Sequence, residues 1–412
     1  MFNQFQLSPV DIDRFRIGPL GPHIARFASL LSEQGYSKQM GMQKIRLVAF
    51  LSRWLGKRKV RIRQIDEQRI ADFLKAQRQP LRRHRQVQHT LAQLLQHLRH
   101  SKVIPDLRTS QAESPIELLI HDYGQFLARE RGLSQLTLDN YLPVARRFLS
   151  NSFGVKTVQL GKLTAKDVNR FILRDKATFS PKRVQLTTSA LRSFLGFLYQ
   201  HGQLPVPLAT AVPTVAIWRF SELPKFLEPE QVERLVQSCD RSNLCGRRDY
   251  AALLLLARLG LRAGELVHLC LEDINWNVGE ILIRGKSSRE DRLPLAPDVG
   301  CALAAYLQKG RPACSSRRVF IRIKAPHVGF SSSVAICDIV RRALLRANLH
   351  PEGKGSHLLR YSLATQMLRG GASLTQIGQI LRHQLPQTTE IYAKVNLAAL
   401  RALAQPWPGG VR

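Results

Sequence analysis

The sequence predicts a multidomain, mainly α-helical protein with a small β-sheet in its last domain, an α+β arrangement. Its 412 residues, 44% of them hydrophobic, are enough for two or three domains with cores of their own. The first half of the chain repeats apolar residues at helical spacing, with Gly and Pro between the segments. One segment of the second half alternates apolar and polar residues instead, as a β-strand does.

The first half of the chain consists of two similar segments, each typical of one small helical domain. LLSEQGYSKQMGMQKIRLVAFLSRWLG resembles FLARERGLSQLTLDNYLPVARRFLSNSFG, and RQIDEQRIADFL resembles KLTAKDVNRFIL. Matched residues, such as Gly35 and Gly132, lie roughly a hundred residues apart, which is a domain-sized period. Any two sets of amphipathic helices share some pattern, but the matching order, spacing and terminal proline favour duplication. We therefore predict helical domains at residues 1–110 and 116–205, the first a diverged copy of the second.

A linker and a third domain follow. GQLPVPLATAVPTVAIWRFSELPKF is rich in proline and lacks helical period, which predicts a linker at residues 206–226. A domain at residues 227–405 then opens at LEPEQVERLV, whose acidic residues suit the first turn of a helix. Most of this domain has helical period. The exception is GEILIRGKSSREDRLPL, where an alternating segment, a polar turn and a second short strand predict a β-hairpin.

The charge balance indicates the class of partner. The chain has 62 Lys and Arg against 30 Asp and Glu, a formal net charge of +32. Such an excess favours a polyanion, because phosphate contacts release condensed counterions and supply most non-specific affinity. Ribosomal and membrane-surface basic proteins usually carry lysine-rich tails. Here the positive charge is mainly arginine and is spread through apolar-patterned segments, so DNA or RNA is the favoured partner.

The cysteines and the apolar runs indicate the compartment. The six cysteines all lie in the second half and form no CxxC pair, so neither a zinc ribbon nor a redox motif is expected. Reduced thiols in a cytosolic protein are the simple interpretation. The first residues have no basic segment followed by an apolar run, so no signal peptide is expected. YAALLLLARLGL is interrupted by Arg258 and is too short to span a bilayer, so we expect a cytoplasmic protein without membrane contact.

Two cationic residues lie at turns of the last domain. Arg262 follows Gly260 at a helix junction in LARLGLRAGELVHL. Its planar fork could bind a phosphate bidentately, or it could serve only to cap a helix and pair with Glu265. Lys286 lies at the tip of the predicted hairpin, where lysine is common simply because the tip is solvated. A lysine at that place could also reach into a groove and donate a proton.

Two further motifs bring in histidine and tyrosine. HLLRYSLAT sets His357 and Arg360 three residues apart, on one face of a helix. Single polar residues on amphipathic helices are usually solvated or satisfied locally, so this pair alone decides nothing. LRHQLPQTTEIYAKV places His383 nine residues before Tyr392, and a helical tyrosine there would ordinarily be a core or half-buried residue.

Taken in order, GLRAGEL, the GK hairpin, HLLRYSLAT and RHQLPQTTEIY resemble the tyrosine recombinases, or phage-integrase family. The resemblance covers residues 225–400, and the second helical domain is similar to the family's core-binding, SAM-like DNA-binding domain. Each motif is weak alone, whereas their joint order and spacing are specific. Two residues depart from the family pattern: Arg382 stands where the family usually has Gly, and Tyr361 stands where His is frequent.

The resemblance implies a site-specific recombinase that cleaves and rejoins DNA through a 3′-phosphotyrosine intermediate. The two arginines would hold the phosphate and stabilise the transition state, and the tyrosine would be the nucleophile. The lysine would protonate the leaving oxygen, the first histidine would assist proton transfer at the tyrosine, and the second would bind the phosphate. These cations replace a metal ion, so neither a metal nor a cofactor is expected. The implied catalytic residues are Arg262, Lys286, His357, Arg360, His383 and Tyr392.

The resemblance also implies an assembly and a setting. It implies a homotetramer on two double-stranded DNA sites in the nucleoid, with companion recombinases as an option and a mobile element as the context. VNLAALRALAQPW, after Tyr392, is a short apolar segment that would dock on a neighbouring protomer. Two alternatives stay open: a type IB topoisomerase-like nicking and closing enzyme, and a non-catalytic DNA-binding regulator derived from a recombinase.

Overall fold

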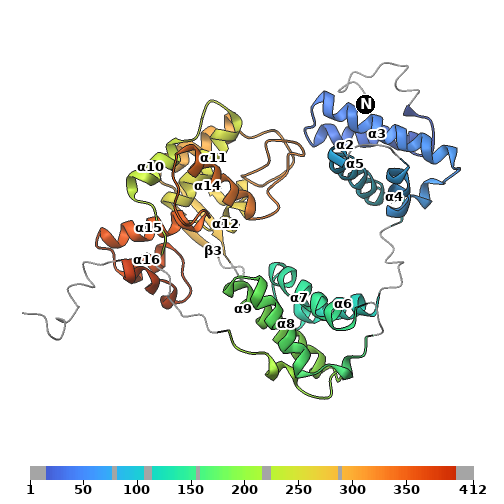
Figure 1. The fold of residues 1–412 in the computed structure, drawn as a ribbon. Helices are drawn as coiled ribbons and strands as arrows, with labels where there is room; N and C mark the ends of the chain where they lie inside the picture. The colour runs from blue at the N-terminus through green and yellow to red at the C-terminus, as the bar shows by residue number, and fades with distance from the viewer. Residues whose placement is uncertain are drawn as a thin grey trace, which may run out of the picture. The chain divides into compact units, whose positions relative to one another are not determined.

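The structure is a computed structural model that describes residues 15–76, 81–105, 114–154, 158–215, 224–285 and 290–395. It is built of helices with one three-stranded sheet, which confirms the predicted fold class (Figure 1). Within these ranges, every helix is too short or too polar to cross a bilayer. Each part of the chain is described by itself below.

In its described residues, the first helical unit contains four helices with a common core. The helix that starts at Lys38 is capped by Ser37, whose hydroxyl accepts a hydrogen bond from the Met40 amide at 3.4 Å. The helix that starts at Glu67 is capped by the Asp66 carboxylate, which accepts a hydrogen bond from the Arg69 amide at 2.9 Å. The helices are α2 (Gly21–Glu33), α3 (Lys38–Lys57), α4 (Glu67–Lys75) and α5 (Leu81–His100). Their apolar faces bury Ile24, Phe27, Leu31, Ile45, Phe73 and Leu98.

The second helical unit, within residues 105–221, is compact by itself. Its helices are α6 (Pro115–Arg129), α7 (Gln135–Phe153), α8 (Ala165–Thr178) and α9 (Pro181–Gln200). Aromatic side chains of three helices, Tyr123, Phe148 and Phe194, are fully buried in its core. Leu208 and Val212 pack into the same core, so this part of the predicted linker is folded onto the second unit. Residues 216–223 of the predicted linker lie outside the described residues.

The two helical units match in detail. Both have four helices in the same order, and α3 and α7 start after Ser37 and Ser134. The turns before them contain Gly35 and Gly132, whose φ angles of 78° and 57° suit glycine. α5 and α9 both have 20 residues. The duplication stays a prediction, and this correspondence is the structural observation that supports it.

The last domain is organised around α11 (Leu244–Arg258), which is buried on nearly every face. Ala251, Ala252 and residues 253–256 of this helix contact the surrounding helices in one large core. A helix that is apolar all round belongs inside a domain, which explains the YAALLLLARLGL run. The other helices are α10 (Pro229–Gln237), α12 (Ala263–His268), α13 (Pro297–Lys309), α14 (Val334–Arg346), α15 (His357–Arg369) and α16 (Leu374–Ile380).

The sheet of this domain has three antiparallel strands in the order β1 (Ile274–Asn275), β2 (Glu280–Arg284) and β3 (Glu290–Pro294). Ile281 pairs with Leu293 in the β2–β3 register, which confirms the predicted hairpin. β1 was not predicted, because two residues are too few to give a periodic pattern.

A second, smaller hydrophobic cluster closes the domain, and we call it the satellite core. It consists of Ala364, Ile377, Leu381 and Tyr392, all buried, with partly buried apolar side chains around them. These residues come from α15, α16 and the 3-10 helix η8 (Glu390–Val395). The tyrosine that the sequence analysis singles out is therefore a core residue in this structure.

Candidate active site

Arg262 is fixed at the start of α12 by Glu265. Gly260, with a φ of 58°, turns the chain out of α11, and a Cβ there would lie 2.7 Å from Leu381 Cδ2. The Arg262 amide donates to Glu265 Oε2 at 2.8 Å, and Arg262 Nη1 donates to Glu265 Oε1 at 2.8 Å. The Arg262 side chain is still 40% exposed. It therefore has the pairing that was one alternative for this residue, and also an exposed face that a phosphate could reach.

Arg360 lies beneath the surface, one turn after His357 on α15. Its residue surface is only 2% exposed, and its guanidinium donates to the carbonyl oxygens of Gly260 and Leu381. Burial, followed by repulsion from Arg262 and Arg382, lowers the pKa of Arg360 to about 10. The group remains cationic near neutral pH. His357 is exposed at the first position of α15, so the two residues share a helix face but differ in depth.

Tyr392 lies next to these cations but is enclosed. It is 1% exposed, it lies close enough to Arg360 for the guanidinium to act on its phenol, and its ring packs edge-on to Tyr361 with centroids 5.9 Å apart. Burial raises the pKa of Tyr392 to about 12, although Arg360 and Arg262 oppose the increase. The phenol is therefore protonated near neutral pH. The sequence analysis placed this residue on a helix, and the structure gives a 3-10 helix instead.

His383 is stacked on the tyrosine. The two rings are nearly parallel, at 4°, with centroids 6.3 Å apart, and His383 Nδ1 lies 2.8 Å from Thr389 Oγ1. Desolvation, followed by the charges of Arg360, Arg262 and Arg382, lowers the pKa of His383 to about 4. Partial desolvation and the charges of Arg360 and Arg262 also lower the pKa of His357. Both imidazoles are neutral near neutral pH and can accept a proton or a hydrogen bond.

Arg382 belongs to this cluster, although the sequence analysis noted it only as a departure from a family pattern. Its Nη2 donates to Glu265 Oε2 at 2.9 Å, and both side chains are almost fully buried. Burial raises the pKa of the Glu265 carboxyl, but the charge of Arg382 and the hydrogen bonds from Arg262 outweigh it and hold the pKa below its usual range. One carboxylate thus bridges two arginines.

The structure brings together five of the six predicted site residues. The charges of Arg262 and Arg360 act on all three of His357, His383 and Tyr392. Lys286 falls outside the described residues, between β2 and β3. In the part of the chain that the structure describes, no three His, Cys, Asp or Glu side chains come together as ligands for a metal ion. The cluster can bind an anion and place a phenol and two neutral imidazoles beside it.

We expect Glu265→Ala to be strongly destabilising. The substitution leaves Arg382 buried without its carboxylate, and breaking a buried pair from one side costs about 3–5 kcal/mol. Urea denaturation measures the free energy of unfolding. The control is Glu228→Ala, which removes the exposed Glu228–Arg369 pair and should cost no more than about 1 kcal/mol. Equal losses in the two variants would contradict the bridging role of Glu265.

The depressed pKa of His383 predicts a pH-dependent stability. Between its usual value of 6.5 and about 4, the unfolded chain binds a proton that folded His383 does not. Stability is therefore fully present above pH 6.5 and falls as the pH decreases toward 4, by up to roughly 3 kcal/mol from this group. His383→Gln should reduce the slope of unfolding free energy against pH in this window. His268→Gln, at an exposed histidine of α12, is the matched control variant.

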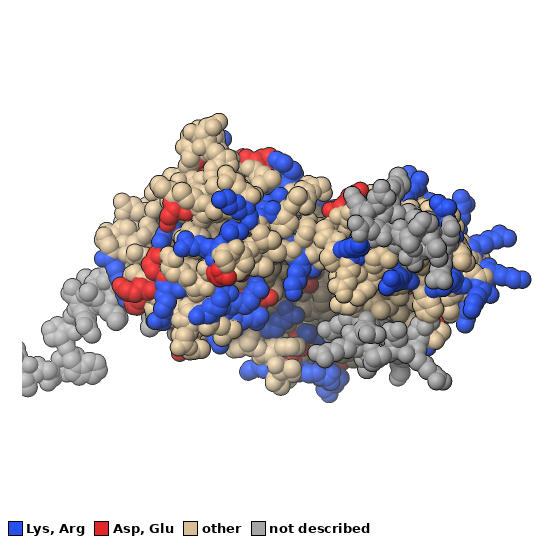
Figure 2. Space-filling model, turned by 90° about the horizontal axis from the view of Figure 1, so that it is seen from above, with Lys and Arg blue, Asp and Glu red and all other residues tan. Residues whose placement is uncertain are grey.

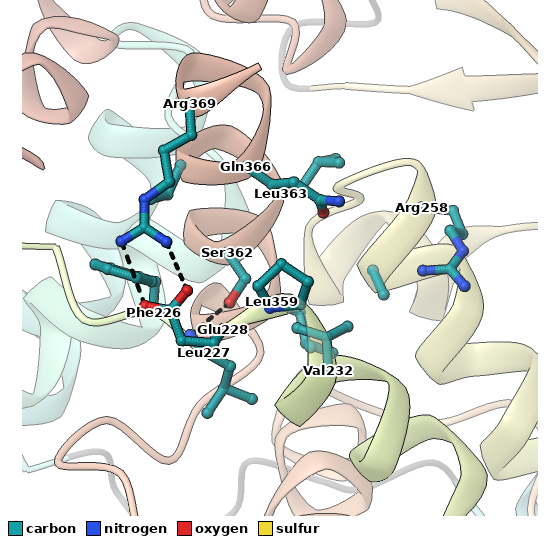
Figure 3. Close-up of a pocket in the computed structure, with 13 residues that line it drawn as sticks. Phe226, Leu227, Glu228, Val232, Arg258, Leu359, Ser362, Leu363, Gln366 and Arg369 are labelled. Atoms are coloured by element: carbon teal, nitrogen blue, oxygen red, sulfur yellow. Dashed lines mark hydrogen bonds and ion pairs between the residues drawn. The ribbon is translucent and has the colours of Figure 1, made fainter. Parts of the chain in front are cut away.

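A pocket beside α15 lies apart from this cluster. It is lined by the segment before α10, by α10 itself, by the end of α11 and by α15 (Figure 3). At its edge Arg369, the last residue of α15, pairs with Glu228, and the Leu227 amide donates to Ser362 Oγ at 2.8 Å. This pocket contains none of the predicted catalytic residues.

Comparison with known proteins identifies the family to which the chain belongs. A sequence model described as the Phage integrase family matches residues 225–398, and one for the N-terminal SAM-like domain of phage integrases matches residues 120–202. A putative integrase/recombinase of Sinorhizobium fredii, y4rA, is 41% identical over 95% of both chains. The tyrosine recombinase XerC of Oceanobacillus iheyensis is 30% identical, over 69% of this chain and 94% of its own.

Solved structures show the same fold. XerH site-specific recombinase bound to its palindromic difH substrate aligns with a TM-score of 0.56 at 18% identity, over 72% of this chain and 98% of that one. A lambda integrase dimer bound to a core site aligns with a TM-score of 0.52 at 17% identity, over 71% and 98%. At these identities the likeness shows the fold alone, whereas the sequence matches show the family. The chain belongs to the phage integrase family, the tyrosine-type site-specific DNA recombinases.

Proposed function

We propose that the protein cleaves and rejoins double-stranded DNA at specific sites through a 3′-phosphotyrosine formed by Tyr392. The observation that carries this proposal is that Tyr392 lies beside Arg360, whose charge acts on the phenol together with that of Arg262, while the tyrosine ring stacks on neutral His383. A nucleophile and an anion-binding group are thus adjacent. Covalent catalysis divides one difficult displacement into two easier ones and retains the phosphodiester energy without ATP.

The arginines would neutralise the phosphate. Fixed donors aimed at developing charge usually supply the largest part of catalysis, because they need no reorganisation during the reaction. Arg262 has an exposed guanidinium whose direction is set by Glu265, and Arg360 has donors that now contact two carbonyl oxygens. We assign both to the non-bridging oxygens of the scissile phosphate.

The proton balance follows from the neutral histidines. Tyr392 attacks phosphorus and loses its proton, and the bond from phosphorus to the 5′-oxygen breaks. His357, whose pKa is lowered by desolvation and neighbouring arginines, is suited to accept the phenolic proton. Lys286 would protonate the departing 5′-oxygen, and His383 would hydrogen-bond the phosphate. Attack of a 5′-hydroxyl on the phosphotyrosine reverses these steps and releases the tyrosine.

The enclosed position of Tyr392 adds a requirement. A side chain that is 1% exposed, with a pKa raised to about 12, must leave the satellite core before it can meet a phosphate. Bound DNA or a neighbouring protomer would supply the free energy for this change, since only differential affinity shifts a conformational equilibrium.

The proposed partners are DNA and other recombinase protomers. Lys and Arg side chains outnumber Asp and Glu on the face in Figure 2, in keeping with the net charge of +32. We propose a homotetramer on two DNA sites, in the nucleoid, acting on a mobile element. One solved relative is a lambda integrase tetramer on a Holliday junction, which supports the stoichiometry by analogy. The mass of the complex with DNA would establish the number of protomers and any companion recombinase.

Covalent trapping tests the proposal. The full chain is incubated with nicked fragments of DNA from its native locus, so that the cleaved end diffuses away and the adduct accumulates. Digestion of the SDS-resistant product should give a peptide that carries the DNA on Tyr392. Salt-sensitive binding without an adduct would favour a regulator, and relaxation of supercoils without strand exchange would favour a nicking and closing enzyme. An adduct on another residue would reject the assignment of Tyr392.

A further inference from the structure

Arg382 occupies a backbone position that suits glycine. Its φ is 55°, in the left-handed region. It follows the C-terminal cap of α16, where the Arg382 amide donates to the Gln379 carbonyl at 3.0 Å and the His383 amide donates to the Gly378 carbonyl at 2.9 Å. These two bonds form a complete Schellman motif, whose left-handed residue is usually Gly. The long Arg382 side chain makes a buried contact from this position that glycine could not make.

The contact is with the carboxylate that holds Arg262. Arg382 Nη2 donates to Glu265 Oε2 at 2.9 Å, and Arg382 Nη1 donates to the Ile380 carbonyl at 3.2 Å. Glu265 Oε2 also accepts from the Arg262 amide, while Oε1 accepts from Arg262 Nη1, each at 2.8 Å. The Glu265 carboxylate thus accepts two hydrogen bonds from Arg262 and one from Arg382.

The two arginines differ in access. The Arg382 side chain is 4% exposed and its guanidinium donates to Glu265 and to the Ile380 carbonyl, whereas the Arg262 side chain is 40% exposed. With Arg382 present, the single negative charge of Glu265 is shared between two cations, so Arg262 keeps more of its positive field for an outside anion. Without Arg382, the same carboxylate would interact with Arg262 alone and would lose one of the three hydrogen bonds that hold its orientation.

We propose that Arg382 is a positioning residue, which locks the shared Glu265 carboxylate and thereby directs the Arg262 guanidinium toward the scissile phosphate. The inference rests on the proposed function, because it assumes that Arg262 binds that phosphate. It concerns a residue that departs from the family pattern noted above, which usually has Gly at this position.

Three substitutions test it in single-turnover cleavage of nicked DNA. Arg382→Gly provides the residue that the backbone prefers and removes only the guanidinium. We expect cleavage to slow by about 10- to 100-fold, because a displacement of the Arg262 guanidinium by about 1 Å is enough for an effect of this size. Arg382→Lys should recover part of the rate. The matched control is Arg369→Ala. It removes the Arg369–Glu228 pair at the C-terminal end of α15, and this variant should cleave at the wild-type rate.

The pH profile separates positioning from simple stabilisation. Removing Arg382 takes away the foremost charge that keeps the pKa of Glu265 low against burial. The acidic limb of the cleavage rate should therefore move to higher pH in Arg382→Gly and stay near the wild-type position in Arg382→Lys. If Arg382→Gly does not fold, Arg382→Asn serves instead, because asparagine tolerates left-handed backbone.

A double substitution tests whether Arg382 affects cleavage only through its contact with Glu265. In a Glu265→Gln background, where the shared charge is absent, adding Arg382→Gly should slow cleavage no further. Equal rates and superimposed pH profiles for wild type and Arg382→Gly, with an adduct in both, would overturn this inference and leave the proposed function standing. Absence of an adduct in the wild type would overturn both. Additive losses in the double variant would also overturn it, because they would mean that Arg382 acts independently of Glu265.

Discussion

Tyr392→Phe is expected to abolish covalent capture of DNA while leaving the fold intact. The substitution removes one oxygen from a buried ring and keeps its packing against Tyr361 and His383. It deletes the proposed nucleophile, so no residual adduct should form, whereas site-specific binding should persist. SDS-resistant adducts on nicked DNA measure cleavage, and thermal unfolding of the same samples checks the fold.

The matched control for this experiment is Tyr361→Phe. It removes the hydroxyl of the neighbouring tyrosine, whose ring packs edge-on to Tyr392 within the same hydrophobic cluster. Adduct formation should survive this change. An adduct that persists in Tyr392→Phe would reject the nucleophile assignment, and loss of the adduct in both variants would mean that the packing of the rings, rather than one oxygen, determines activity.

Arg360→Ala is expected to have two large effects. It removes a proposed phosphate ligand, and loss of one such preorganised donor slows catalysis by about 10²–10³-fold. It also leaves the carbonyl oxygens of Gly260 and Leu381 buried without their arginine donor, at about 1–3 kcal/mol for each unsatisfied group. Single-turnover cleavage per folded molecule and urea denaturation measure the two effects separately.

A second buried arginine of the same domain separates these effects. Arg248 is 5% exposed and donates to the Ile321 carbonyl and the Asp249 carboxylate. Arg248→Ala should lose comparable stability yet cleave DNA at the wild-type rate per folded molecule. If both variants lose only stability, Arg360 is a structural residue and the phosphate-binding role is wrong.

The sequence predicted the elements that depend on local pattern. The helical units and the β2–β3 hairpin were predicted from periodicity. The grouping of Arg262, His357, Arg360, His383 and Tyr392 was implied by the family resemblance. The carbonyl partners of Arg360 could not be predicted, because they lie 100 and 21 residues away along the chain. The ordinary interpretation of Tyr392 as a core residue described its burial correctly.

Arg382 and Glu265 show why the site was only partly predictable. Glu265 was considered as a partner of Arg262 because the two are three residues apart, within one helical turn. Its second partner is 117 residues away, a contact that neither spacing nor composition indicates. The available signal was the substitution at a turn position where the family usually has Gly, which sequence reasoning recorded without giving it a role.

The satellite core makes the availability of the proposed nucleophile, Tyr392, depend on how often this cluster opens. Its buried apolar members, Ala364, Ile377 and Leu381, form a cluster distinct from the main core around α11, so it can open locally while the domain stays folded. The observed cleavage rate is then the intrinsic rate multiplied by the open fraction. Each 1.4 kcal/mol added to the closed cluster would reduce that fraction about tenfold. For this enzyme, a better-packed cluster means a more stable and a slower protein.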